Sequence, residues 1–253
     1  MAQLCAPQRS KSGVLNSITL LGSSSGRNAG DAALISGIMD AVDRACGVSL
    51  RYEVPTIRPG YIGNLYGARV QPVAILPWNF SLKMLGFPTY RSLMRTDLSL
   101  VFDAILFDRA LFNPFFNFLS SLYVLMPLAK KAGKKMGFFN VGIGPVRTPL
   151  GRRMLRELSE MMDFITVRDQ DSYDILREVG VQNPRVLVTA DAALNVQAAP
   201  AEVADQVFAR FGFAPGQEVL GINVNTYIDS WSGAKTPSLG RDRFVAIYCA
   251  ALN

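Results

Sequence analysis

Short apolar runs alternate with amphipathic stretches along residues 17–189, and this alternation restricts the fold more than any other feature of the sequence. The runs have the length of buried strands, and the stretches between them carry apolar residues at helical spacing. Strands that alternate with helices build parallel sheets, because a helix usually returns the chain to the start of the next parallel strand. The sequence therefore predicts an α/β fold with a doubly wound parallel sheet.

The individual elements are expected where this pattern is clearest. Strands are predicted at residues 17–21, 50–54, 100–107, 135–141, 164–167 and 185–189, and helices at residues 30–46, 114–131, 149–162 and 171–179. The stretch 55–98 is rich in proline, glycine and aromatic residues, so we expect irregular structure with short helices there. Asparagines and serines interrupt the apolar helix at 114–131, which favours burial against the sheet over a membrane-spanning role.

The domain organisation follows from a change in composition near residue 198. The chain of 253 residues is long enough for one large domain and part of another. An Ala- and Pro-rich stretch with a short helix precedes one new apolar run at 218–223 and a helical stretch at 244–252. Because one strand and one helix do not make a domain, we expect most of a second domain to be missing. The expected parts are a flexible N-terminus (1–14), a Rossmann-like domain (15–197), a linker (198–216) and the start of a second Rossmann-like domain (217–253).

Composition excludes several kinds of chemistry. The chain has no histidine, which excludes Ser-His-Asp and Cys-His catalysis and His-based zinc sites within these residues. The three cysteines lie far apart without metal-ligand spacing, so we expect no metal site, and a reducing cytoplasm is the simplest compartment.

The net charge of +6 favours anionic ligands, whereas the basic residues lack the pattern of a nucleic-acid-binding protein. Lysines 130–135, after the apolar helix, leave open contact with the inner face of a membrane.

The first of four candidate segments is Gly22–Asp31, which lies between the first predicted strand and the first predicted helix. Glycines let the backbone approach a ligand, and a helix N-terminus suits a phosphate or a carboxylate. The spacing matches neither the dinucleotide fingerprint nor the P-loop. An equally weighted alternative is that the glycines only form the turn and Asp31 caps the helix.

The other three segments also follow predicted strands, where open α/β sheets bind ligands. Asn140–Pro145 offers a close backbone approach, or forms only a tight turn into the next helix. Arg168 is a fixed cation for a carboxylate or phosphate. An ion pair of Arg168 with Asp31 or Asp191 is the structural alternative. Asp191 suits a sugar hydroxyl, or caps the next turn.

Arg168 is followed by residues that suit a helix N-terminus. Asp169, Asp171 or Ser172 can each accept a hydrogen bond from the first turn of the predicted helix. The segment 166–172 therefore combines a candidate ligand contact with a cap.

In this order and spacing the four segments resemble the polysaccharide pyruvyl transferase family over roughly residues 15 to 225. The most specific part is the R-D-x-x-S segment, which precedes a helix ending in Leu-x-x-x-Gly-Val. Asn28, Gly30 and Asp31 match the family's N-x-G-D segment, and Gly142–Pro145 matches its G-x-G-P turn. Arg168, Asp169 and Ser172 match the R-D-x-x-S segment, and Asp191 matches the family's final aspartate.

The resemblance implies a fold, a reaction and a set of residues. The fold is the first half of a two-domain, glycosyltransferase-like (GT-B-like) architecture. The reaction transfers a pyruvyl group from phosphoenolpyruvate to two hydroxyls of a glycan or lipid-linked saccharide, forming a cyclic ketal in surface or exopolysaccharide synthesis, with no separate cofactor. The implied catalytic residues are Arg168 and Asp31, and the implied substrate-binding residues are Gly26, Asn28, Gly30, Asn140, Gly142, Gly144, Asp169, Ser172 and Asp191.

Two features depart from the family pattern. The general acid expected in the family, a histidine of the second domain, is not in this chain, so we expect the chain alone to be catalytically inert. Residues 107–112 replace a run of glycines that many members carry, which makes Asp108 and Arg109 candidates for the lost ligand contact. This departure keeps open a nucleotide-sugar glycosyltransferase of similar architecture. The missing half and the absent histidines keep open a non-catalytic ligand-binding protein.

Overall fold

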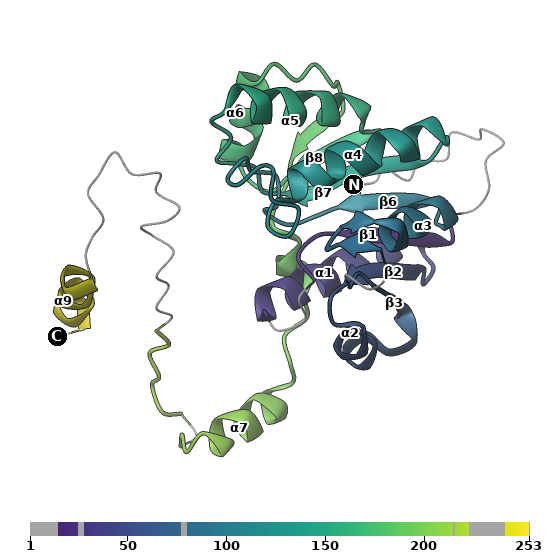
Figure 1. Cartoon of the computed structure of the whole chain (residues 1–253). Helices are drawn as coiled ribbons and strands as arrows, with labels where there is room; N and C mark the ends of the chain where they lie inside the picture. The colour runs from purple at the N-terminus through teal and green to yellow at the C-terminus, as the bar shows by residue number, and fades with distance from the viewer. Residues whose placement is uncertain (1–14, 25–27, 77–79, 215, 223–240, 253) are drawn as a thin grey trace. The chain divides into compact units, whose positions relative to one another are not determined.

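The computed structural model describes residues 15–24, 28–76, 80–214, 216–222 and 241–252. By its internal contacts the chain divides into two units, Met1–Gln197 and Ala198–Asn253, and each is described by itself. Figure 1 labels the elements of both.

The first unit is built on a seven-stranded, wholly parallel sheet with the strand order β3-β2-β1-β6-β7-β8-β9. The α/β, doubly wound fold predicted from the sequence is therefore confirmed (Figure 1). The strands are β1 (Ser17–Leu21), β2 (Arg51–Thr56), β3 (Val70–Ala74), β6 (Leu98–Val101), β7 (Lys135–Val141), β8 (Phe164–Val167) and β9 (Val186–Val188), beside a two-stranded hairpin of β4 (Ser81–Leu82) and β5 (Leu85–Gly86).

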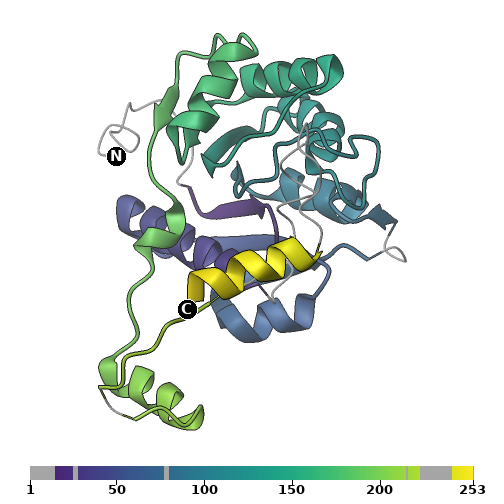
Figure 2. The ribbon, with the colours of Figure 1, turned by 90° about the vertical axis from the view of Figure 1, so that its left-hand side faces the viewer.

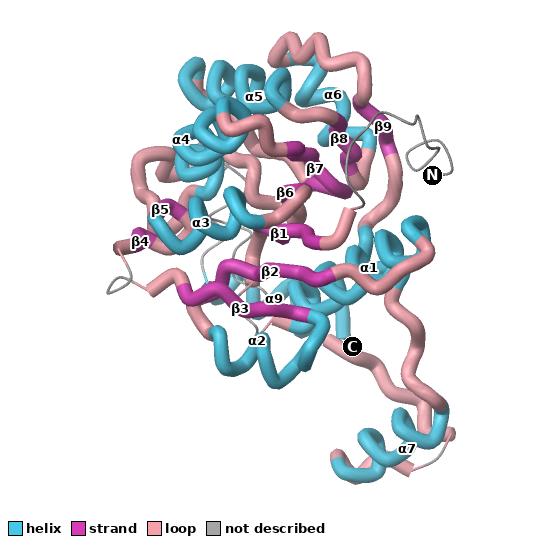
Figure 3. Tube along the Cα trace, turned by 90° about the vertical axis from the view of Figure 1, so that its right-hand side faces the viewer, coloured by secondary structure: helices cyan, strands magenta, loops and turns pink. Residues whose placement is uncertain are grey.

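Helices cover both faces of the sheet and bury two separate cores. The helices of this unit are α1 (Ala29–Cys46), α2 (Pro59–Tyr66), η1 (Gly67–Arg69), α3 (Phe87–Arg95), α4 (Phe118–Lys131), α5 (Pro149–Met161), α6 (Gln170–Glu178) and η3 (Ala192–Asn195). One core joins α1, α2 and η3 to the sheet, and the other joins α3, α4, α5 and α6. Figures 2 and 3 show α1 and the pair α4 and α5 on opposite sides of the strands.

The strands supply both cores because successive side chains point to opposite faces. In β1, Ile18 and Leu20 belong to the core under α1, whereas Leu21 belongs to the core under α4. All five residues of β1 are buried, as expected for a central parallel strand. α4 buries one apolar face in the second core, whereas Val124 and Leu128 on its other side are exposed. The helix predicted at 114–131 is therefore packed against the sheet on one face.

Capping residues set the helix bounds that periodicity left uncertain. α4 begins at Phe118 and not at residue 114, because Asn117 is its N-cap. The Asn117 side chain accepts a hydrogen bond from the Ser120 N–H and donates to the carbonyls of Phe107 and Arg109. α1 ends where Gly47 adopts the left-handed conformation at φ 70°.

Three predictions about strands were wrong. The stretch 55–98 contains the expected short helices, but it also contains the edge strand β3, whose Pro72 made it look irregular. An edge strand tolerates proline because one side of it carries no ladder. The strand predicted at 100–107 spans Leu98–Val101, because Asp103 at φ 72° turns the chain out of the sheet. Of the strand predicted at 218–223, residues 218–222 form no strand within the described chain, and residue 223 lies outside the described residues.

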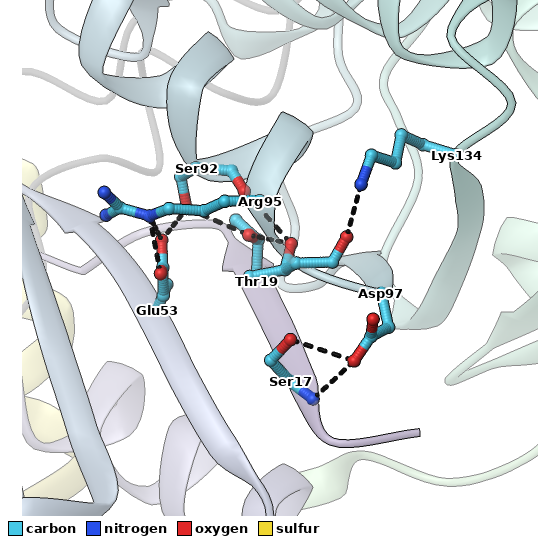
Figure 4. A network of polar contacts seen from close by, with 8 residues as sticks. Ser17, Thr19, Glu53, Ser92, Arg95, Asp97 and Lys134 are labelled. Atoms are coloured by element: carbon cyan, nitrogen blue, oxygen red, sulfur yellow. Dashed lines mark hydrogen bonds and ion pairs between the residues drawn. The ribbon is translucent and has the colours of Figure 1, made fainter. Parts of the chain in front are cut away.

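A buried polar network fixes α3 to the sheet (Figure 4). The Glu53 carboxylate of β2 accepts hydrogen bonds from Ser92 Oγ at 2.6 Å and from Arg95 Nε at 2.7 Å. Thr19 of β1 shares hydrogen bonds with the hydroxyls of Ser92 and Thr96, at 2.9 and 2.7 Å. Since unpaired polar groups are costly in a core, these bonds explain how β1 and β2 carry polar residues towards α3.

The second unit contains α7 (Ala201–Arg210) and α9 (Arg241–Leu252). The Phe208 and Phe213 rings pack edge to face, with centroids 5.9 Å apart. α9 covers the helical stretch predicted at 244–252.

Candidate functional site

The order of the strands places a topological switch at the centre of the sheet. From β1 the chain first builds β2 and β3 on one side, and then crosses to β6 on the other side of β1. In doubly wound sheets, ligands bind at the carboxyl ends of the strands beside such a switch. Gly22 follows β1 at this point, and a Cβ atom there would lie 2.6 Å from the ring of the buried Phe102, just after β6.

A pocket of about 230 Å³ lies at this edge, and we call it the β1 pocket. The carboxyl ends of β1, β2 and β3, the N-terminus of α1, the β4–β5 hairpin and the start of α4 form its walls. Its polar lining is Ser23, Ser24, Asn28, Asp31 and Lys83, and the remaining lining is Gly22, Ile57, Ile75 and Phe118.

Asn28 and Asp31, two residues of the predicted site, form one wall of the β1 pocket. Asn28 is the N-cap of α1 and accepts a hydrogen bond from the Gly30 N–H at 3.0 Å, so the alternative in which Asp31 caps the helix was wrong. The Asn28 amide also donates to Asp31 Oδ1 at 3.0 Å. Asp31 is only 7% exposed. Gly26 lies outside the described residues.

A pair of hydroxyls joins this turn to the end of β2. Ser24 Oγ donates to the Pro55 carbonyl, and Thr56 Oγ1 donates to the Ser24 carbonyl. Both hydroxyls are buried. The floor of the pocket is therefore held by side-chain bonds between neighbouring strand ends.

Lys83 is a pocket residue that sequence reasoning missed. It lies in the turn of the β4–β5 hairpin, and its Nζ sits 4.4 Å from the centroid of the Phe118 ring. Burial lowers the pKa of Lys83 below its usual value. In the sequence, Lys83 is a lysine between apolar neighbours in a stretch without helical or strand periodicity. That pattern does not distinguish a pocket residue from a surface residue.

The remaining predicted residues gather at the ends of β7, β8 and β9, and we call this group the Arg168 cluster. Arg168 Nη1 lies 3.1 Å from Asp191 Oδ2, which realises one of the two ion pairs considered from the sequence. Arg168 Nε lies 3.4 Å from Asp169 Oδ2. The members of the cluster are Asn140, Gly142, Gly144, Arg168, Asp169, Ser172 and Asp191.

Each motif of the Arg168 cluster holds another in place. Asp169 is the N-cap of α6, and accepts from the Ser172 N–H at 2.8 Å. Ser172 Oγ in turn accepts from the Ile143 N–H at 2.9 Å, which joins the R-D-x-x-S segment to the G-x-G-P turn. Burial alone would raise the pKa of Asp169, but hydrogen bonds from Ser172 and the Arg168 guanidinium hold this pKa below its usual value.

Two residues after β7 owe their identity to close contacts. A Cβ atom on Gly142 would lie 2.8 Å from the Arg168 guanidinium, so a larger residue would force this side chain to move. Gly144 has φ 105°, a conformation that favours glycine.

Asn140 joins three strand ends although its backbone is strained. Its φ is 52°, a left-handed conformation in which asparagine is the best-tolerated residue after glycine. Its amide donates to the Ala190 carbonyl at 2.6 Å, and its Oδ1 accepts from Thr166 Oγ1 at 2.9 Å. The buried Asn140 side chain therefore fixes the position of the segment that carries Asp191.

The β1 pocket and the Arg168 cluster are connected through α1. Asp191 caps η3, accepting from the Ala193 N–H at 2.9 Å. η3 packs against α1 so closely that a Cβ atom on Gly37 would lie 1.9 Å from the Ala192 carbonyl oxygen. One helix thus presents Asn28 and Asp31 at its N-terminus and supports the Asp191 segment at its middle.

Asp108, considered from the sequence as a replacement ligand contact, is held by the backbone. Its Oδ2 accepts from the N–H groups of Arg147 and Thr148, and the side chain is buried. Asp108 therefore fixes the loop before α5. The Arg109 carbonyl accepts from Asn117.

Together, the parallel sheet, the switch at β1 and the polar pocket at its carboxyl edge define a Rossmann-like domain with a candidate ligand pocket. The family model "Polysaccharide pyruvyl transferase" matches residues 28–234, from the cap of α1 onwards, and the chain belongs to this family. A search of the curated proteins finds no match. None of the helices in the described ranges is long and apolar enough to cross a membrane.

Proposed function

We propose that this protein takes part in the transfer of a pyruvyl group from phosphoenolpyruvate to a saccharide, with formation of a cyclic ketal. The observation that carries the proposal is the family match, which includes the Arg168 cluster and the lining of the β1 pocket from Asn28 onwards. The acceptor is a glycan or a lipid-linked saccharide of a surface or exopolysaccharide.

The proposed reaction sets clear demands on the site. Two sugar hydroxyl oxygens form bonds to C2 of phosphoenolpyruvate, and the bond from C2 to the phosphate oxygen breaks. Of the two hydroxyl protons, one ends on the methylene carbon, which becomes a methyl group, and the other on the departing phosphate. The site must therefore orient hydroxyls, bind the anionic groups of the donor and move protons.

The described residues offer groups for these tasks. Asp31 is a buried carboxylate on the wall of the β1 pocket, and we assign it to orient or deprotonate an acceptor hydroxyl. Arg168 has its Nη1 and Nε directed at two carboxylates, and its side chain is 30% exposed. Because a guanidinium carries five N–H donors, an incoming carboxylate or phosphate can bind while these pairs persist.

Ligand-dependent unfolding temperature tests the proposal. A ligand that binds only the native state raises the midpoint, by a free energy of about 2.7 kcal/mol at a hundred times its dissociation constant. We expect phosphoenolpyruvate to raise the unfolding midpoint of the full chain in a concentration-dependent way. A rise with UDP-glucose alone would indicate a nucleotide-sugar glycosyltransferase, and no rise with either ligand would overturn the proposed donor.

A further inference from the structure

The β4–β5 hairpin brings a lysine into the β1 pocket that no family motif contains. Lys83 has φ 57°, a left-handed conformation that costs free energy for any residue with a side chain. The pairing of Ser81 with Gly86 and of Leu82 with Leu85 holds the turn in this shape. The ammonium lies over the ring of Phe118, the first residue of α4.

The charge of Lys83 differs from that of Arg168 in its ion pairing. Among the residues that the structure describes, no carboxylate forms an ion pair with Lys83, whereas Arg168 faces both Asp169 and Asp191. Burial is the single cause that lowers the pKa of Lys83. Burial of half the ammonium costs free energy because water is removed from the charge, and the aromatic ring offsets only part of this cost. A bound anion would offset the rest.

Another part of the lining of the β1 pocket has the reverse polarity. There, Asp31 and Asn28 present a carboxylate and an amide, groups that recognise hydroxyls. The volume of about 230 Å³ is below the roughly 300 to 1,000 Å³ of pockets for drug-sized ligands. Such a pocket takes a small anion beside one hydroxyl-bearing group.

We propose that Lys83 binds the anionic end of the donor in the β1 pocket, through its phosphate or carboxylate, and that Asp31 contacts the acceptor hydroxyl in the same pocket. This rests on the proposed function and assigns the donor contact to a residue outside the family motifs. Arg168, which is already paired with Asp169 and Asp191, remains the candidate contact for the second anionic group of the donor.

Calorimetric titration of the full chain with phosphoenolpyruvate tests the assignment. The variant Lys83→Met removes the charge and keeps an unbranched side chain of similar length. The control Lys131→Met removes the same charge from an exposed position of α4. Because a hydrogen bond to a charged group contributes enough for about a ten- to hundredfold change in affinity, we expect a loss of that size for Lys83→Met and less than about a twofold change for Lys131→Met.

Chemical labelling of the unmodified protein gives a second readout that does not depend on how the variant folds. We expect acetic anhydride to acetylate Lys83, and phosphoenolpyruvate or inorganic phosphate to slow this acetylation while that of Lys131 stays unchanged, as measured by mass spectrometry of peptides. Protection by inorganic phosphate without any effect of phosphoenolpyruvate would keep the anion site and overturn the proposed function. Equal binding of phosphoenolpyruvate by the Lys83→Met and Lys131→Met variants would keep the proposed function and overturn the role of Lys83.

Discussion

At the scale of single residues, the glycines at this edge of the sheet make room for other groups. Gly22 admits the Phe102 ring, and Gly142 admits the Arg168 guanidinium. The missing Cβ of glycine thus allows close packing at both positions. At Gly142, the side chain that packs closely is that of Arg168, which is proposed to bind the donor.

The substitution Gly142→Ala separates this role from stability. Its Cβ would lie 2.8 Å from Arg168, so the guanidinium must move and lose its geometry with Asp191. A partly exposed ion pair contributes about 0–1 kcal/mol, and we expect urea unfolding to show a loss of that order. We also expect calorimetry to show weaker binding of phosphoenolpyruvate. Unchanged binding would contradict the assignment of Arg168 to the donor, with Gly60→Ala, a position with open space around it, as the control.

At the scale of elements, α1 is the part that couples the two groups of candidate residues. Its N-terminus carries Asn28 and Asp31, and its middle packs on η3 beside Asp191. A shift of η3 relative to α1 would therefore displace the Asp191 segment while leaving the β1 pocket with its own bonds.

The substitution Gly37→Ala tests this contact. Alanine is intrinsically better in a helix by about 1 kcal/mol, yet its Cβ would lie 1.9 Å from a backbone oxygen that no rotamer change can remove. We expect a net destabilisation of about 1–3 kcal/mol in urea unfolding, typical of overpacking. Gly60→Ala, in α2, is the matched control, and equal effects of the two substitutions would mean that η3 is not held against α1.

How far the sequence predicts the molecule also depends on scale. The apolar runs of the sequence predicted β1, β7 and β8 at their observed bounds. Interior parallel strands are buried on both faces, so their sequences are nearly continuous apolar runs. β3 escaped because an edge strand with a proline lacks that pattern.

The residues of the candidate site that belong to sequence motifs were predictable, whereas those that only the tertiary structure brings together were not. The motifs located Asn28, Asp31, Arg168 and Asp191, but the division into a pocket and a separate cluster depends on strand order. Lys83 comes from a hairpin that only tertiary structure brings beside α4.

At the scale of the whole molecule, aspartates at the ends of strands tie the sheet together electrostatically. Asp97 accepts from the N–H groups of Asn16 and Ser17 at the start of β1. Asp163 accepts from the Met136 N–H in β7 and lies 3.3 Å from Lys130 Nζ. Burial would raise the pKa of each carboxyl, but these hydrogen bonds and nearby lysines hold both pKa values below their usual range.

These shifts predict how stability depends on acid. A carboxyl whose pKa is lower in the folded than in the unfolded state stabilises the fold above the unfolded value of about 3.9, and this contribution is lost as the pH falls towards the folded pKa. We therefore expect the free energy of unfolding to fall below about pH 4. Asp163→Asn should lower stability at neutral pH and flatten its dependence on pH below 4, measured by urea unfolding across pH. Asp205→Asn, at an exposed position of α7, should leave the dependence unchanged, and an unaltered acid limb in Asp163→Asn would contradict the role given to these bonds.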